Sequence, residues 1–404
     1  MKKAGALVVA SLASLVACGG SAQAPSGGMV VSSDPGLVRA GEALIGDLAR
    51  RSGLPLRAPV RLERRSREHL VRYLESKLDE ELPVDEARAT VDAYALLGLV
   101  PADLDLRAVL MALYTEQIAG FYEPDSTTLF VLDDQPDAML QGLLVHELVH
   151  AIQDQNVDLD ALTDRALGND RAIAAQAAIE GHATLVMLEY MTEEMAGASV
   201  DFGALPEFAE QMRPAIEAMR TQFPALAGAP RVIQESLLFP YLEGAGFVQS
   251  LWRGRERTAP FGEWLPLSTD QVLTGDFEDD PVELALTVSG ARVVREDVLG
   301  RLETSVLLDE HGGADARAIA GGWAGDRYVL VDPASGGGRA LVWYVLWETQ
   351  ADRERFAAAM APWLGAQGGS AALEQVDIAD SPATVLRVGA LEGVTVSVTR
   401  AEGT

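Results

Sequence analysis

The sequence has little cysteine and little positive charge, and both shortages exclude classes of protein. Among 404 residues there is one cysteine, Cys18, so neither a disulfide framework nor a cysteine-based zinc finger can form. Acidic residues outnumber basic ones by 60 to 32, which gives a formal net charge of −28. A surface this negative repels phosphate backbones, so we expect no nucleic-acid partner. The apolar fraction of 48% excludes a wholly disordered chain.

The N-terminus has the features of an export signal. Lys2 and Lys3 precede an uncharged run, 4–17, which is too short for a membrane-spanning helix of about 20 apolar residues. The run ends in Leu15-Val16-Ala17-Cys18, which resembles the lipobox of bacterial lipoproteins, where the cysteine becomes the lipidated N-terminus. We therefore expect a signal peptide at 1–17 and a lipid anchor at Cys18. The alternative is an ordinary secretory signal with an incidental cysteine.

The lipobox resemblance implies a location at the surface of a bacterial envelope membrane. Gly19, rather than Asp, follows Cys18, and this favours the outer membrane over the inner one. Residues 18–36 are rich in Gly, Ser, Ala and Pro, a composition that indicates a flexible tether.

The remaining chain predicts an α+β protein in two domains. Residues 37–265 mostly show helical periodicity, interrupted by a β-hairpin signal around the turn Glu123-Pro124-Asp125-Ser126, and so predict a mainly helical domain with a small hairpin or sheet. Residues 266–404 predict a small α+β domain with a meandering sheet. We expect helices at 137–156 (capped by Asp137), 170–194, 240–252 and 351–360, and strands at 328–331, 341–347, 384–388 and 394–398.

One pentapeptide, His146-Glu147-Leu148-Val149-His150, carries most of the chemistry. Residues four apart share one face of a helix, so both imidazoles can reach one ion, and neutral imidazole is a good zinc ligand. Glu147 lies near the same surface and can take a proton from a zinc-bound water without binding the ion itself. With five histidines in the chain, a chance match is rare, although two surface histidines on a helix remain the alternative.

A third ligand must come from elsewhere in the chain. An HExxHxxGxxH site would need Gly at 153 and His at 156, but the chain has Gln153 and Asn156. A Glu on a following helix is the other solution, and Glu180 fits best because small residues on its face let two helices approach closely. Those small residues are Ala177, Ala183 and Thr184.

Other polar side chains near these positions have weaker claims. His182 is the rival ligand, but it points about 200° away from Glu180 on the same helix, so we expect it beside the site or at the surface. Asp154 could orient an imidazole. Hydrolysis also needs a donor for the developing oxyanion, for which Tyr241 is the first candidate, followed by Tyr122 and His311.

The pentapeptide, Glu180 with Gly181, and the preceding hairpin resemble the gluzincin branch of zinc metallopeptidases (peptidase MA-like). The resemblance implies a zincin-like metallopeptidase domain with His146, His150 and Glu180 as ligands and Glu147 as general base. It also implies that Gly120–Tyr122 or Leu129–Leu132 forms the strand beside bound peptide.

A longer set of segments resembles an uncharacterised group of bacterial envelope proteins. These segments are Gln117–Tyr122, His146–Gln155, Phe239–Tyr241 and Ser268–Gln271. One departure from the thermolysin-like pattern is Thr184, since those proteins have an acidic residue four positions after the ligand Glu.

These observations favour a zinc-dependent hydrolase, specifically a peptidase acting on a peptide or protein substrate. The alternative is a catalytically inactive zincin-fold lipoprotein that acts as a binding or assembly module, which Thr184 and the added C-terminal domain favour. A purely structural lipoprotein is the third hypothesis.

Overall fold

The computed structural model describes residues 28–198, 200–205, 209, 211–214, 223–255, 257–313 and 315–401. Cys18, the predicted signal peptide and most of the predicted tether lie outside these residues. Within the described ranges, none of the helices combines the length and the apolar character that a membrane crossing requires.

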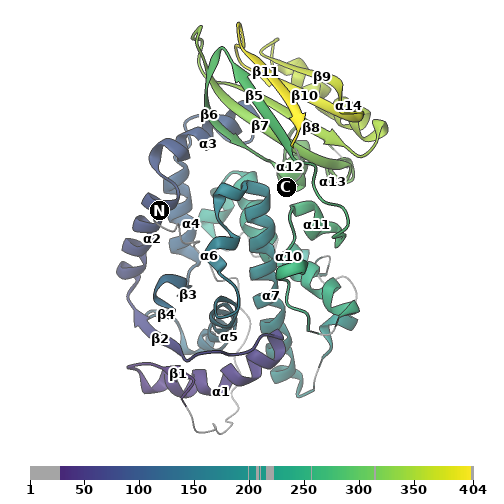
Figure 1. Ribbon diagram of the computed structural model, residues 1–404. Coiled ribbons are helices and arrows are strands. Elements are labelled where there is room, and N and C mark those ends of the chain that lie inside the picture. Colours follow the sequence, from purple (N-terminus) through teal and green to yellow (C-terminus); the bar gives the residue numbers. More distant parts are fainter. Residues whose placement is uncertain are drawn as a thin grey trace.

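The chain alternates between helices and short strands in its first part and is rich in strands in its last part (Figure 1). The helices are α1 Pro35–Ser52, α2 Arg67–Glu81, α3 Val84–Leu96, α4 Leu106–Gln117, α5 Asp137–Asp154, α6 Leu159–Leu162, α7 Asn169–Ala196, α9 Pro224–Gly228, α10 Arg231–Gly254, α11 Thr269–Thr274, α12 Gly300–His311, α13 Ala316–Ala320 and α14 Gln350–Ala366. The strands are β1 Val30–Val31, β2 Val60–Arg65, β3 Gly120–Glu123, β4 Thr128–Leu132, β5 Leu284–Ser289, β6 Ala291–Asp297, β7 Trp323–Pro333, β8 Ala340–Trp347, β9 Ala371–Ile378, β10 Ser381–Val388 and β11 Thr395–Arg400.

A small mixed sheet supports the helix that carries the pentapeptide. Its strand order is β1-β2-β4-β3, with β2 parallel to both β1 and β4 and with β3 antiparallel to β4 at the edge. Because side chains alternate along a strand, Tyr122 and Leu129 pack with residues of α1 and α5, whereas Phe121 and Phe130 pack with residues of α2. The sheet therefore has helices on both faces, and the predicted hairpin is confirmed.

Helices α7 and α10 cross with their backbones in direct contact. A Cβ atom added to Gly181 of α7 would lie 2.0 Å from the carbonyl carbon of Gly244 of α10. A Cβ atom added to Gly244 would lie 2.2 Å from the backbone oxygen of Ala177. Only glycine permits this approach, which brings Glu180 of α7 next to residues of α10.

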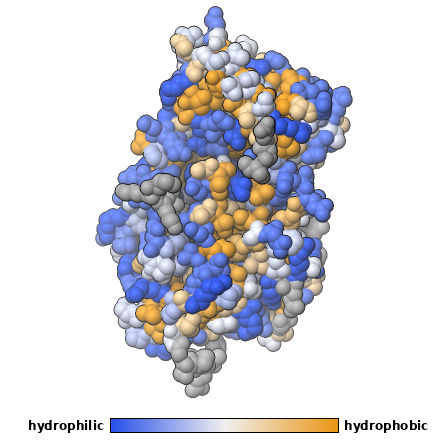
Figure 2. Space-filling view, in the orientation of Figure 1, coloured by the Kyte–Doolittle hydropathy of each residue, from blue (hydrophilic) through white to orange (hydrophobic). Residues whose placement is uncertain are grey.

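The C-terminal region is built on a five-stranded antiparallel sheet with the strand order β6-β7-β8-β10-β9. One face packs on α12, α13 and α14 through Trp343, Trp347 and Phe356, and the other face is covered by the antiparallel ribbon β5–β11. Figure 1 shows this region above the helical part, and Figure 2 shows a band of apolar side chains along the middle of one face of the helical part. The predicted α+β class is confirmed.

The structure corrects several predicted element bounds. Helix α10 begins at Arg231, nine residues before the predicted start, so Pro240 is an interior residue rather than the first one. Residue 137 is the first residue of α5, and Pro136 occupies the cap position predicted for Asp137. Strand β2 and helix α12 have no counterpart among the predicted elements. The predicted boundary at residue 265 is not tested and stays a prediction.

Candidate metal centre

His146, His150 and Glu180 form a buried group of side chains that could hold a metal ion. Helix α5 supplies both histidines one turn apart, and α7 supplies the glutamate. The Nε2 atoms of the two imidazoles are 3.0 Å apart. The Oε2 atom of Glu180 is 3.2 Å from Nε2 of His146 and 3.4 Å from Nε2 of His150. The structure therefore brings the three predicted ligands together.

These separations match the geometry of one tetrahedral zinc ion. Ligand atoms bound at about 2.0–2.1 Å, with tetrahedral angles between them, lie about 3.3 Å from one another. Two imidazole nitrogens and one carboxylate oxygen are also a donor set that zinc commonly takes. The residues therefore fit a divalent metal ion, including the zinc that the sequence predicts.

The charges of the three side chains depend strongly on one another. Burial opposes ionisation of Glu180, but the two histidines outweigh it and lower the pKa of Glu180 to about 2. Burial lowers the pKa of His146. Burial has the same effect on His150, but the carboxylate of Glu180 is stronger and raises the pKa of His150 to about 9. At neutral pH the negative charge of Glu180 is therefore matched by the positive charge of His150, and a metal ion that binds here would displace the His150 proton.

Glu147 lies beside this group, and its carboxylate is less well bonded. Its exposed fraction is 0%, and among the described residues neither oxygen has a hydrogen bond of ordinary geometry, although the backbone N–H of Tyr122 is close enough to oppose the rise in pKa that burial causes. Burial raises the pKa of Glu147 to about 8, with Glu180 adding to the effect and His150 opposing it. A buried carboxyl group without a hydrogen bond is costly, so it is a candidate for a chemical role rather than a structural one.

Tyr241 on α10 lies next to His146 of the same group of side chains. Its ring stacks near the ring of His146, with centroids 6.2 Å apart, and its buried hydroxyl lies near Glu180 but has no hydrogen bond of ordinary geometry among the described residues. Burial, with the carboxylates of Glu180 and Glu147, raises the pKa of Tyr241 well above its ordinary value. The hydroxyl therefore keeps its proton and can act as a donor.

The two other candidate oxyanion donors have partners elsewhere. The Tyr122 hydroxyl donates to Oδ2 of Asp154 at 2.9 Å. The Nε2 atom of His311 lies 2.8 Å from the backbone oxygen of Leu97, and its ring stacks on Trp363. Both side chains are thus engaged away from the three possible ligands, and Asp154, considered as a group that could orient an imidazole, bonds to Tyr122.

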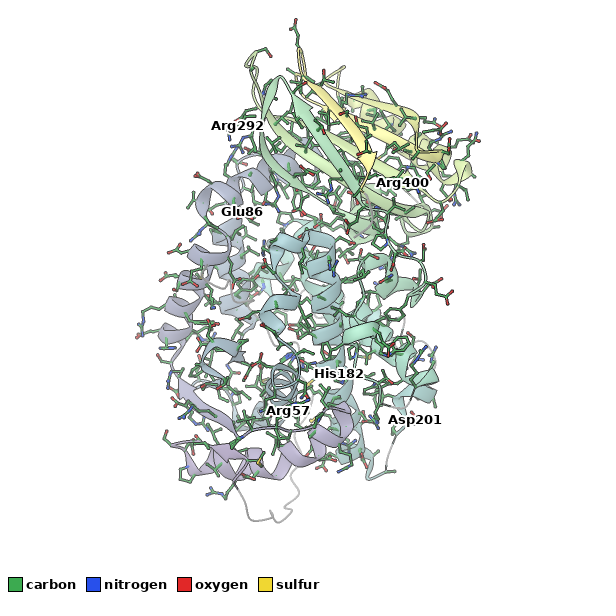
Figure 3. All side chains as sticks on the ribbon, viewed as in Figure 1. Arg57, Glu86, His182, Asp201, Arg292 and Arg400 are labelled. Carbon is green, nitrogen blue, oxygen red and sulfur yellow. The ribbon has the colours of Figure 1, made fainter. Side chains whose placement is uncertain are left out.

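Sequence reasoning missed the residue that does contact His150. The Nδ1 atom of His150 is 2.8 Å from Oε1 of Gln153, which is three residues later on α5 and completely buried. His182, which Figure 3 places inside the helical part, is 3.1 Å from the same amide and is also completely buried. The helical spacing of His150 and Gln153 is a signal that could have identified this contact. The Thr184 hydroxyl is buried and contacts no ligand.

Comparisons with known proteins say little about this centre. The sequence profile of a domain of unknown function (DUF8575) matches residues 287–404. The match covers most of the C-terminal region and excludes the candidate metal centre. Searches of curated proteins and of solved structures gave no match. Any function must therefore be argued from the residues of the centre, which fit a zincin-like site.

Proposed function

We propose that this chain is a zinc-dependent hydrolase that cleaves peptide bonds. The observation that carries the proposal is the unpaired, fully buried Glu147 beside His146, His150 and Glu180. The three possible ligands lack a fourth protein donor, and the carboxylate next to them has no structural partner among the described residues. This is the division of roles that a metal-assisted hydrolase requires.

Each side chain of the centre has a distinct part in this chemistry. A zinc ion held by His146, His150 and Glu180 would lower the pKa of a bound water to about 7 and would polarise a carbonyl group. Glu147 accepts a proton from the attacking water and gives it to the leaving nitrogen. Burial alone would keep Glu147 protonated near neutral pH, and a zinc ion beside it would favour the ionised form that accepts the water proton.

Tyr241 serves as the oxyanion donor in this proposal. Its hydroxyl proton lies near the carboxylate of Glu180 without a hydrogen bond of ordinary geometry, so it is available to bond to the developing negative charge. Its place on α10 depends on the contact between Gly181 and Gly244, which sets the separation of α10 from α7.

The small sheet supports a peptide as the substrate. Strand β3 is at the edge of the sheet, whereas β4 is internal, so of the two predicted strands only Gly120–Tyr122 can pair with an added chain. An edge strand binds extended peptides through main-chain hydrogen bonds. The strand lies next to α5, since Tyr122 packs in the same cluster as Leu148.

Glu147→Gln tests the proposed reaction. We expect cleavage of a peptide library to fall by about 10²–10⁴-fold, the usual contribution of a general base, while zinc content stays at one ion per chain. Glu303→Gln is the matched control, because Glu303 is a buried glutamate whose carboxylate bonds to Tyr94 and Asn169. A wild-type chain that binds zinc and cleaves no member of a broad library would contradict the peptidase assignment.

That result would support a second candidate function, an inactive zincin-like module that binds a partner. The burial of the centre favours it, because Glu147, His150 and Glu180 are each 0% exposed and a substrate must gain access to them. The Thr184 hydroxyl forms no hydrogen bond with any of the three possible ligands, which also favours an inactive module.

We also propose a lipid anchor at Cys18 in a bacterial envelope membrane. The lipobox-like residues 15–18 and the Gly- and Ser-rich segment after them support this location. Palmitate labelling of the expressed protein should disappear in Cys18→Ser. Labelling that persists in this variant would refute the anchor without bearing on the metal centre.

A further inference from the structure

We propose that Gln153 and His182 are positioning residues for the candidate metal centre. Together they hold the proton of His150 on Nδ1 and leave its Nε2 lone pair directed at the ion. The inference rests on the proposed function, since it assigns a role toward the same centre. The argument starts from the backbone carbonyl groups of Ser52 and Ile179, which can only accept hydrogen bonds.

The direction of each hydrogen bond follows from groups that can only accept. The backbone oxygen of Ser52 lies 3.0 Å from Nε2 of His182, so this nitrogen carries a proton. The backbone oxygen of Ile179 lies 3.0 Å from the amide nitrogen of Gln153, which fixes that amide with its nitrogen toward α7. The second proton of the amide then points to Nδ1 of His182 at 3.1 Å.

This arrangement decides the form of His150. With its nitrogen facing α7, Gln153 turns its oxygen toward His150, and an amide oxygen accepts only. Nδ1 of His150 must therefore donate to it, across 2.8 Å. A neutral His150 ring then has its lone pair on Nε2, the atom that faces His146 and Glu180. The chain of contacts selects the ring form that can bind a metal.

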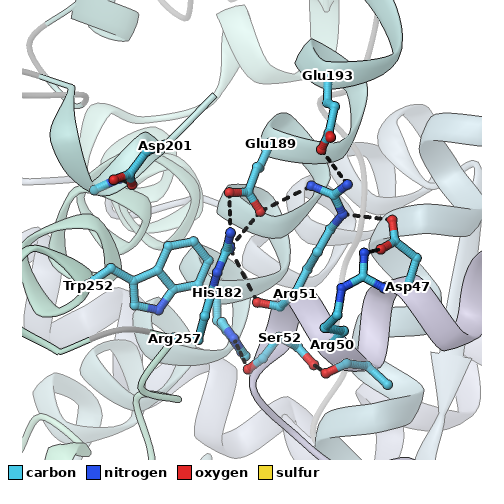
Figure 4. Close-up of polar contacts among 12 residues, drawn as sticks. Asp47, Arg50, Arg51, Ser52, His182, Glu189, Glu193, Asp201, Trp252 and Arg257 are labelled. Atoms are coloured by element: carbon cyan, nitrogen blue, oxygen red, sulfur yellow. Dashed lines mark hydrogen bonds and ion pairs between the residues drawn. The ribbon is translucent and has the colours of Figure 1, made fainter. Parts of the chain in front are cut away.

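The far end of the chain of contacts is anchored at the C-terminal end of α1. Figure 4 shows His182 bonded to Ser52, next to an ion-pair network that joins α1 to α7. Arg257 binds both oxygens of the buried Glu189 at 2.6 Å each, and Arg51 approaches the same carboxylate at 3.4 Å. Glu189 lies on α7, as His182 does, so the network holds the Ser52 carbonyl against His182.

A neutral amide at this position suits the charge of the centre. Glu180 supplies one buried negative charge to the centre, and Glu147 can supply a second when it is ionised. A carboxylate in place of Gln153 would add a third buried negative charge, whose desolvation is costly. An amide oxygen orients His150 without that cost. Gln153 can therefore fix the orientation of His150, whereas the Thr184 hydroxyl bonds to none of the possible ligands.

Zinc affinity of the full chain, measured by competition with a chelator, tests the proposal. Gln153→Met keeps the side-chain length and removes both hydrogen-bonding groups, and we expect zinc to bind about 10–100-fold more weakly. Gln153→Glu keeps an acceptor for His150 and should bind zinc more tightly than Gln153→Met. Gln141→Met is the matched control on the same helix, since Gln141 bonds to Tyr190 and touches no ligand. Its affinity should equal that of the wild type.

A second measurement does not depend on zinc. In the metal-free wild type, a long-range proton–nitrogen spectrum should show His182 as the neutral ring with its proton on Nε2. A proton on Nδ1 instead would overturn the proposal, and so would a folded Gln153→Met chain that loses less than about 10-fold in affinity. If the wild type binds no zinc, the proposed function fails, but the spectrum still decides whether the hydrogen bonds run in the proposed direction.

Discussion

The helical part and the C-terminal region each bury a carboxylate, and they satisfy it in opposite ways. Asp326 of β7 is 3% exposed and accepts four hydrogen bonds at 2.7–2.9 Å. The donors are the backbone N–H groups of Leu299 and Gly300 and the ring N–H groups of Trp323 and Trp343. Glu147 of α5 is 0% exposed and accepts none.

The different hydrogen bonding of Asp326 and Glu147 indicates that the first carboxylate stabilises the fold and that the second is available for chemistry. Asp326 ties the start of α12 to the central strands of the C-terminal sheet, so its charge serves to hold the fold together. Glu147 has no such task, and its desolvation is offset only if a cation or a substrate enters the centre. A buried acidic residue therefore indicates a site only when the fold leaves it without hydrogen-bond donors.

The largest effect should come from substituting the satisfied carboxylate. Asp326→Asn replaces one acceptor oxygen with an amide NH2 group and leaves two buried donors unpaired, which costs about 2–6 kcal/mol at 1–3 kcal/mol each. Glu147→Gln should change the free energy of unfolding by less than about 1 kcal/mol, because no hydrogen bond is lost. Urea denaturation of both variants measures this, and equal destabilisation would remove the distinction between the two carboxylates.

The contact between α7 and α10 should be the next most sensitive feature. Gly181→Ala places a methyl group against the backbone of Gly244, closer than two non-bonded atoms can approach, and should lower the free energy of unfolding by about 1–3 kcal/mol. Zinc binding should also weaken, because Glu180 moves with α7. Gly46→Ala is the control. Gly46 is at an exposed position of α1 with no atom within 4 Å of the added Cβ, so the substitution should stabilise the chain by about 0.5–1 kcal/mol. Opposite signs for the two variants are expected in thermal unfolding, and the same sign would contradict the close crossing.

The smallest effect, counted for a change of one pH unit, is a dependence of stability on pH at the junction of the two regions. Burial raises the pKa of Asp170 at the start of α7 to about 8; hydrogen bonds from Thr269 oppose this, and the nearby Asp326 and Asp270 add to it. The folded state therefore binds a proton more tightly than the unfolded state, whose pKa is near 3.8. Stability from this group is fully present below pH 4 and falls as the pH rises to 8, by at most about 1.4 kcal/mol per pH unit.

Asp170→Asn should flatten that dependence, because an amide does not titrate in this range. The exposed Glu392→Gln serves as the control and should leave the slope unchanged. Denaturation midpoints between pH 5 and 8 give the slopes. A slope for Asp170→Asn as steep as that of the wild type would assign the pH dependence to other groups, such as Glu303, whose pKa burial also raises to about 8.

Local patterns of the sequence were sufficient to select the three side chains that the structure brings together in the candidate metal centre. A helix repeats every 3.6 residues, so the spacing of His146 and His150 is enough to place both imidazoles on one face of α5. Glu180 was predicted because a zinc site with two histidines needs a third protein ligand. The hairpin and the strands β7, β8 and β10 were likewise evident from β-rich runs between turn residues.

What the tertiary structure decided is the set of contacts between segments far apart in the chain. The link from His150 through Gln153 and His182 to Ser52 spans α5, α7 and α1, and the crossing at Gly181 joins α7 to α10. No periodicity within one helix reveals which residue of another helix it meets, because that depends on how all the apolar faces are buried together. The sequence by itself determined which side chains could bind an ion, and the packing of the helices determined that these side chains meet and that the carboxylate of Glu147 lies beside them without a hydrogen bond of ordinary geometry.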